Sequence, residues 1–263
     1  MAFFSLKILD AKGNTKFVEC ADKMARIVAT CEYQEGDRIM LESSEKNIHV
    51  WLQLEDALGA NLVYLTGDIF YTIPFGEKKN NMSPKAFSGN VHYLYVREAL
   101  EEEVYAYRNQ AVNVCDQHSI KNLYPHASAN VETRGETVFV APNAIDGCCA
   151  NDSHGRWPYQ SWGINRQPDA ALKIEFGREI EADRAVIFTR ADFPHDNWWT
   201  QVTLTFSDGS TLDWPLEKSR FSQEITFDKK KITWVEISNL IKADDPSPFP
   251  ALTQLEIYGT VAK

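Results

Sequence analysis

Short segments in which apolar and polar residues alternate, or in which β-branched and aromatic residues gather, follow one another along most of the chain. Alternation with a period of two is the pattern of a half-buried β-strand, and Gly, Asp and Asn between segments mark turns. The pattern predicts strands in residues 3–10, 24–33, 37–43, 48–54, 61–67 and 92–100, and again in 170–177, 183–190, 200–210, 231–238 and 252–259. The tetrapeptide SDGS, residues 207–210, predicts the turn of a hairpin.

Many short strands at intervals of roughly 8–12 residues, without a convincing long amphipathic helix, are typical of sandwiches and barrels. The sequence therefore predicts an all-β protein. A polar stretch over residues 113–135 contains a proline and separates two strand-rich blocks of similar length. We expect one β-sandwich over residues 1–118, of unknown role, and a second over residues 125–263, both of the jelly-roll kind.

Composition and charge limit the possible partners. A hydrophobic content of 44% supplies a packed core, whereas disorder needs low hydrophobicity. The net charge of −10 argues against a general binder of nucleic acid or anionic membranes, because such proteins carry clustered positive charge. No apolar run reaches the roughly 18 residues that a membrane-spanning helix needs. We therefore expect neither nucleic acid nor a membrane as a partner.

The cysteines and the N-terminus indicate a cytoplasmic protein. The chain has five cysteines, of which Cys148 and Cys149 are adjacent, and its first residues lack the basic and apolar regions of a signal peptide. Reduced thiols in the cytoplasm are the simplest interpretation. No Cys or His pairs occur at the spacing of a zinc site.

Several motifs in the second block follow one another in a recognisable order. ASAN, residues 127–130, is followed by NAIDG, residues 143–147, then by the tryptophans of RWPYQSWG, by SDGS and by QLEIYG. In this order they resemble the galactose-binding-like jelly roll of discoidin domains (coagulation factor 5/8 type C) and family 32 carbohydrate-binding modules. The first block resembles no family. The segment CCANDSHGR is longer than the family's usual loop, so the identity of the ligand does not carry over.

The resemblance also implies a structural calcium ion beside the DG pair. Carried over by position, Asp146 and Glu256 give carboxylates, Asn143 a backbone carbonyl, and Asn151 or Asp152 a further oxygen. Calcium takes six to eight oxygen ligands of these kinds. In the alternative interpretation Asp146 forms an Asx turn in front of Gly147, and Glu256 is an ordinary strand residue. Both interpretations stay open at this point.

A second group of chemically active residues follows the strand that ends at Arg190. In the resembling modules, loops at one end of the sandwich bind sugar, with aromatic rings stacked on it and polar groups on its hydroxyls. The expected ligand-binding residues are Trp157, Tyr159, Trp162, Arg190, Asp192, His195, Asp196 and Trp198. The alternative is a polar network that only stiffens long loops. One of Trp198 and Trp199 must face the core, since neighbouring strand residues point to opposite faces.

The sequence therefore predicts a non-catalytic carbohydrate-binding protein whose saccharide ligand lies at the loop end of the second sandwich, with calcium as a structural cofactor. Two alternatives belong to other classes. The first is an enzyme of carbohydrate metabolism that uses His195 or His154 with a nearby Asp as acid and base. The second is a homo-oligomer with Tyr159 and Trp199 at its interface.

Overall fold

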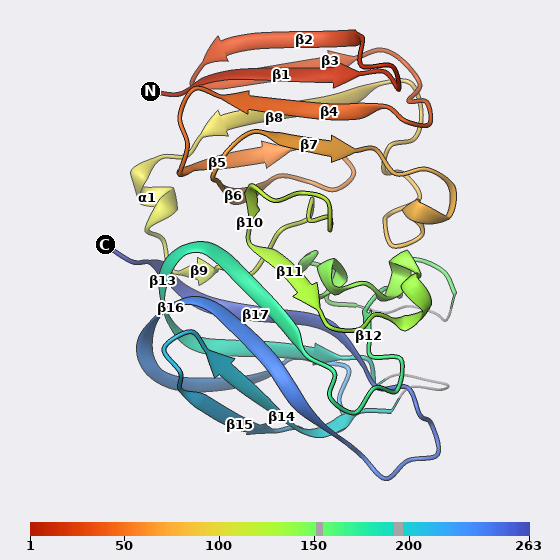
Figure 1. The fold of residues 1–263 in the computed structure, drawn as a ribbon, viewed down its shortest axis with the longest axis vertical. Helices are drawn as coiled ribbons and strands as arrows, with labels where there is room; N and C mark the ends of the chain where they lie inside the picture. Colours follow the sequence, from red (N-terminus) through yellow and green to blue (C-terminus); the bar gives the residue numbers. More distant parts are fainter. Residues whose placement is uncertain (151–154, 192–196) are drawn as a thin grey trace.

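The computed structural model describes residues 1–150, 155–191 and 197–263. The all-β prediction is confirmed, because the described chain forms three antiparallel sheets (Figure 1). A strand forms within every predicted range, and β14 (Trp199–Phe206) pairs with β15 (Thr211–Pro215) in the hairpin predicted around SDGS. The helices are short: α1 (Glu101–Val104) and 3₁₀ turns at Gly76–Lys79, Thr133–Gly135, Thr137–Phe139 and Ala141–Ile145. No helix in the described ranges has the length and apolar character that crossing a membrane requires.

Two sheets face each other in the N-terminal sandwich. One has the order β2 (Thr15–Asp22), β1 (Phe3–Leu9), β4 (Arg38–Ser43) and β7 (Ile69–Thr72). The other has the order β10 (Leu123–Tyr124), β6 (Asn61–Leu65), β5 (Ile48–Gln53), β8 (His92–Glu98) and β3 (Met24–Ala29). The alternation seen in the sequence now has a physical meaning: Phe4, Leu6 and Ile8 share one face of β1 and are fully buried in the core between the sheets.

The rest of the chain forms one eight-stranded sheet, which we call the C-terminal sheet. Its main path has the order β12 (Trp162–Gly163), β17 (Ala251–Val261), β13 (Leu172–Thr189), β16 (Gln223–Lys242), β14 and β15. Two further strands join it, since β11 (His126–Ala129) pairs with β13 and β9 (Arg108–Asn109) pairs with β17. The sheet curves around its own core (Figure 1), in which Trp162 and Trp199 are the largest fully buried side chains.

One predicted separation of strands was wrong. Residues 170–177 and 183–190 belong to the single strand β13, which is 18 residues long. Gly177 adopts a φ of 67°, a conformation open to glycine, and the pairing with β16 shifts register between Glu175 and Ile180. This irregularity interrupts the regular pairing without ending the strand. The polar interval over residues 178–182 is therefore part of β13 and not a loop between two strands.

Two short strands cross between the two parts of the structure. β9 precedes residue 118, yet it pairs with β17 at the end of the chain, while β10 returns to pair with β6. Leu123 accordingly lies in the N-terminal core. The backbone N–H of Gln110 donates a hydrogen bond of 2.7 Å to the carbonyl of Ile257. The segment between β9 and β11 is therefore bonded to both parts, rather than being a free linker.

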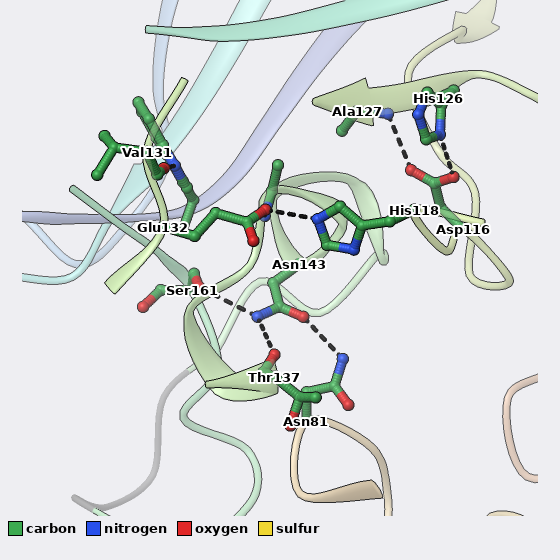
Figure 2. Close-up of polar contacts among 12 residues, drawn as sticks. Asn81, Asp116, His118, His126, Ala127, Val131, Glu132, Thr137, Asn143 and Ser161 are labelled. Atoms are coloured by element: carbon green, nitrogen blue, oxygen red, sulfur yellow. Dashed lines mark hydrogen bonds and ion pairs between the residues drawn. The ribbon is translucent and has the colours of Figure 1, made fainter. Parts of the chain in front are cut away.

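Two histidine–carboxylate pairs secure this crossing segment (Figure 2). Asp116 Oδ1 lies 2.7 Å from His126 Nδ1, and its other oxygen accepts a hydrogen bond from the Ala127 backbone N–H at 2.8 Å. His118 Nε2 lies 2.7 Å from Glu132 Oε1. Both pairs bind residues 116–118 to the start of the second half of the chain.

The pair of His118 and Glu132 perturbs the titration of both members. The hydrogen bond to Glu132 raises the pKa of His118 above its usual value. Burial acts to raise the pKa of Glu132, but hydrogen bonds from His118 and from the backbone N–H of Ala141 leave it lowered. The pair therefore favours the charged form of each side chain.

We predict that Gly259→Ala strongly destabilises the protein. A Cβ at this position would overlap the carbonyl oxygen of Glu181 and lie 2.8 Å from the Cα of Ala182, and backbone cannot move aside as a flexible side chain can. The expected loss is about 1–3 kcal/mol or more, as for other overpacked sites, measured by urea unfolding. The neighbouring Thr260→Ala is the control and should cost far less. Equal stability of the two variants would contradict the close approach.

We predict that His118→Gln lowers stability most in mildly acidic solution. A raised folded pKa means that the contribution of His118 is complete below its unfolded pKa, about 6.5, and is lost as the pH rises through the folded value. The lowered pKa of Glu132 means that its contribution is lost as the pH falls through that value. Because His118 is half exposed, the expected maximum is below about 1 kcal/mol.

The measurement is the free energy of unfolding of both proteins from pH 5 to pH 9. His49→Gln is a control of opposite sign, because burial lowers the pKa of His49 to about 3. That variant should gain relative stability as the pH falls below the unfolded value of about 6.5. A difference between wild type and His118→Gln that does not vary with pH would refute the ion pair.

Candidate ligand-binding site

A cavity of about 180 Å³ opens at the loop end of the C-terminal sheet. It is formed by the turn after β11, the loop after β12, the end of β13 and the segment leading into β17. Its lining consists of Thr133, Arg134, Phe139, Gly163, Ile164, Asn165, Arg166, Arg190, Pro248, Phe249, Pro250 and Ala251. We call it the arginine cavity, because three of these side chains are guanidinium groups.

Hydrogen bonds fix the first two of these segments against each other. The indole of Trp162 donates a hydrogen bond of 2.9 Å to the carbonyl of Val131, and the backbone N–H of Asn165 donates one of 3.0 Å to Thr133 Oγ1. Gly163 allows this approach, since a Cβ there would lie 2.6 Å from Thr133 Oγ1. The loop after β12 therefore has a defined position against residues 131–133.

The backbone of the cavity wall is unusual. Arg134, Asn165 and Arg166 all have positive φ, at 54°, 49° and 61°. Such conformations are uncommon outside glycine and persist where surrounding contacts hold them, often at ligand sites. Here they direct two of the three cavity arginines. The residues with strained backbone conformations therefore lie in the part of the wall that carries Arg134 and Arg166.

The three arginines lie in different environments. Arg190 is only 2% exposed; its guanidinium donates a hydrogen bond of 2.9 Å to the carbonyl of Tyr159 and lies 5.3 Å from that ring. Arg134 is bonded twice to Glu136, at 2.6 and 2.9 Å. Arg166 lies 4.7 Å over the ring of Phe249, which is 45% exposed. One guanidinium therefore lies buried, and another lies beside an accessible aromatic ring.

The side chain of Asn197 positions the segment that leads into β17. Its buried side-chain amide donates hydrogen bonds to the carbonyls of Ala243, at 3.3 Å, and Ser247, at 2.7 Å. Its carbonyl oxygen accepts a bond of 2.7 Å from the backbone N–H of Trp198. Because Ser247 directly precedes Pro248 and Phe249, this amide positions the segment that carries the exposed ring.

The predicted ligand-binding residues do not all line one cavity. Arg190 lines the arginine cavity, and Tyr159 contacts Arg190. Trp162 lies in the core instead, fully buried, because β12 places its ring on the inner face of the sheet. Trp198 lies beside Lys218, whose Nζ is 4.7 Å from its ring. Trp157 lines a different cavity.

The other three predicted ligand residues, Asp192, His195 and Asp196, lie outside the described residues. So do His154 and Asp152, on which part of the enzyme alternative rests. Sequence reasoning missed Arg166 and Phe249. Both lie far from Arg190 in the sequence and within loops, where no periodic pattern marks a shared site.

The proposed calcium ligands are only partly within the described chain, since Asn151 lies outside it. Asp146 accepts hydrogen bonds from the backbone N–H of Cys148, at 2.7 Å, and from Gln160, at 2.8 Å. Burial raises the pKa of Asp146 to about 7. Glu256 accepts a hydrogen bond from the hydroxyl of Tyr258 at 3.0 Å. The calcium site stays a prediction.

The side chain of Asn143 forms hydrogen bonds that join separate segments of the chain. It is bonded to Asn81 and to the carbonyls of Thr137 and Ser161 (Figure 2). Among the described His, Cys, Asp and Glu residues, one group has ligand atoms within 4.8 Å of one another: Glu55, Asp56 and His92, in the N-terminal sandwich. This group lies far from the DG pair, Asp146 and Gly147, in the sequence, and no sequence motif predicted it.

Neither a protein-family model nor a curated protein matches the sequence. Several solved structures match part of the chain. Chitosan-binding module 1 of a chitosanase/glucanase from Paenibacillus sp. IK-5 is 16% identical, with a TM-score of 0.41, over 58% of this chain and 99% of the module. The lectin domain of lectinolysin in complex with Lewis B antigen is 15% identical, with a TM-score of 0.44, over 59% of this chain and 98% of that domain.

A third match is the family 32 carbohydrate-binding module of Clostridium perfringens NanJ in complex with galactose. It is 19% identical, with a TM-score of 0.37, over 50% of this chain and 91% of the module. Over half of its length or slightly more, the chain is therefore structurally similar to carbohydrate-binding modules and lectin domains. At these identities the similarity concerns the fold alone.

Proposed function

We propose that the arginine cavity binds one sugar unit that carries an acidic group, and that the protein is a carbohydrate-binding protein without catalysis at this site. The observation that carries the proposal is Arg166, whose guanidinium lies 4.7 Å over the exposed ring of Phe249 in a cavity that Arg134 and Arg190 also line. A guanidinium beside an accessible aromatic ring favours a ligand that combines an acidic group with an apolar face.

The chemistry of the lining supports a sugar rather than a simple ion. A guanidinium presents paired donors that match a carboxylate or two adjacent hydroxyls. The exposed ring of Phe249 offers an apolar surface for the C–H face of a sugar ring. The volume of about 180 Å³ is below the roughly 300–1,000 Å³ of sites for larger ligands, which favours a single terminal unit.

Binding is favoured over hydrolysis by the nature of the wall. The described lining residues include no carboxylate, imidazole or thiol. Glycoside hydrolysis usually needs two carboxylates beside the scissile bond, one as an acid and the other as a base or nucleophile. The described lining residues thus include groups that hold a ligand and none that moves a proton at neutral pH.

The test is a saccharide-array screen of the full chain followed by calorimetry on the best ligand. A uronic acid or another acidic sugar should bind, and its neutral counterpart should bind at least about tenfold more weakly, since hydrogen bonds between charged groups contribute about 1.5–3 kcal/mol. Arg166→Ala and Phe249→Ala should each weaken binding, and higher ionic strength should do the same.

Arg26→Ala is the matched control, because it removes the same charge from an exposed position in β3 and should leave the affinity unchanged. Equal binding of acidic and neutral sugars, together with full affinity in Arg166→Ala, would refute the proposal. Running the screen with calcium and with a chelator separates the predicted calcium site from sugar recognition. Loss of binding in chelator would support calcium as a structural cofactor.

A further inference from the structure

A cavity of about 500 Å³ lies beside the arginine cavity, between the two halves of the chain. Glu77, Lys78 and Asn80 form one side; they belong to the 3₁₀ turn Gly76–Lys79 and the residue after it, in the segment between β7 and β8. Residues 134–138 and Tyr159 form the other side. We call it the adjoining cavity, because its lining overlaps that of the arginine cavity.

The two cavities share a wall. Arg134 belongs to the lining of both. Tyr159 lines the adjoining cavity, while its carbonyl accepts a hydrogen bond from Arg190 of the arginine cavity. The ring of Tyr159 also lies edge-on to that of Phe139, with 6.3 Å between the ring centres. A ligand longer than one sugar unit can therefore fill the arginine cavity and continue past Arg134 into the adjoining cavity.

The turn on the N-terminal side is held in place by the second half of the chain. The hydroxyl of Thr137 donates a hydrogen bond of 2.9 Å to the carbonyl of Glu77. At the end of the same segment, the amide of Asn81 donates one of 2.9 Å to Asn143 Oδ1 (Figure 2). Because these bonds exist without a ligand, binding does not have to order the turn, and that part of the entropic cost of binding is avoided.

Three side chains of this segment are accessible to a ligand. Glu77, Lys78 and Asn80 are all exposed, and within the described ranges their side chains form no hydrogen bond or ion pair with the protein. They supply a carboxylate acceptor, an ammonium donor and an amide that both donates and accepts. Sugar hydroxyls also donate and accept, so this set of groups matches them.

The charges around the adjoining cavity are balanced. Glu77 and Glu136 are its acidic lining residues, and Lys78 and Arg134 are its basic ones. The arginine cavity, by contrast, has basic residues and no acidic residue in its described lining. The half-buried ring of Tyr159 adds an apolar surface to the balanced lining. This combination favours an uncharged sugar unit next to the acidic one.

We propose that the ligand is an oligosaccharide that ends in a uronic acid, with the uronic acid in the arginine cavity and the next, uncharged unit in the adjoining cavity. The inference rests on the sugar site proposed above. The small volume of the arginine cavity, about 180 Å³, favours a six-carbon uronic acid over larger acidic sugars. The N-terminal sandwich then takes part in recognition, since Lys78 and Asn80 contact the second unit.

The experiment compares glucuronic acid with the disaccharide of glucuronic acid and N-acetylglucosamine, by titration calorimetry of the full chain. The disaccharide should bind about tenfold or more tightly than the single unit, because its second unit adds several hydrogen bonds. Replacing both Lys78→Ala and Asn80→Ala should remove most of this gain and leave the affinity for glucuronic acid unchanged. Both positions are exposed, so the variant should fold.

The matched control combines Lys85→Ala with Asn90→Ala, which are exposed positions of the same segment outside the lining, and it should bind both sugars as the wild type does. Equal affinity for the two sugars would overturn this inference, as would a gain that survives in the Lys78 and Asn80 variant. If glucuronic acid binds and Arg166→Ala weakens it, the arginine cavity stands in either case. Absence of binding by both sugars would overturn the inference, while another acidic sugar bound in the array screen would still support the arginine cavity.

Discussion

The carboxamide of Asn143 holds three chain segments together, and the positions of the arginine cavity and the adjoining cavity depend on it. It is 1% exposed and joins Asn81 to the carbonyls of Thr137 and Ser161. A buried donor or acceptor left without a partner costs about 1–3 kcal/mol, so the segments cannot separate without that loss. Phe139 and Gly163 of the arginine cavity each lie two residues beyond those carbonyls. One buried amide thus positions walls of both sites.

Around this amide the molecule has cavities with different linings. Three arginines line the arginine cavity on loops of the C-terminal sheet, whereas Asp116 and Asp146 line a separate cavity where the two parts of the structure meet. Polar groups in both linings are bonded within the protein, as buried polar groups must be: Arg190 donates to the carbonyl of Tyr159, and Asp116 is paired with His126.

The strands were predictable because alternation in residues such as Phe4, Leu6 and Ile8 reports a buried face directly. The continuity of β13 through Gly177 was not, since a glycine that bends one strand and a glycine that separates two strands give the same local pattern in the sequence. In the candidate site, Arg190 was predictable from its place at a strand end. Arg166 and Phe249 were not, because the contact between them depends on loop conformations with positive φ, which no periodic pattern encodes.

The pairing of β9 with β17 also governs the order in which the chain can fold. The backbone N–H of Ile257 donates a hydrogen bond to the side chain of Asn109, 148 residues earlier in the sequence. During synthesis, β9 leaves the ribosome long before its partner exists, and its edge stays unpaired until the last strand is made. Closure of the C-terminal sheet is therefore a late, long-range event. Folding dominated by such contacts is slow, and exposed strand edges at that stage invite pairing with other chains.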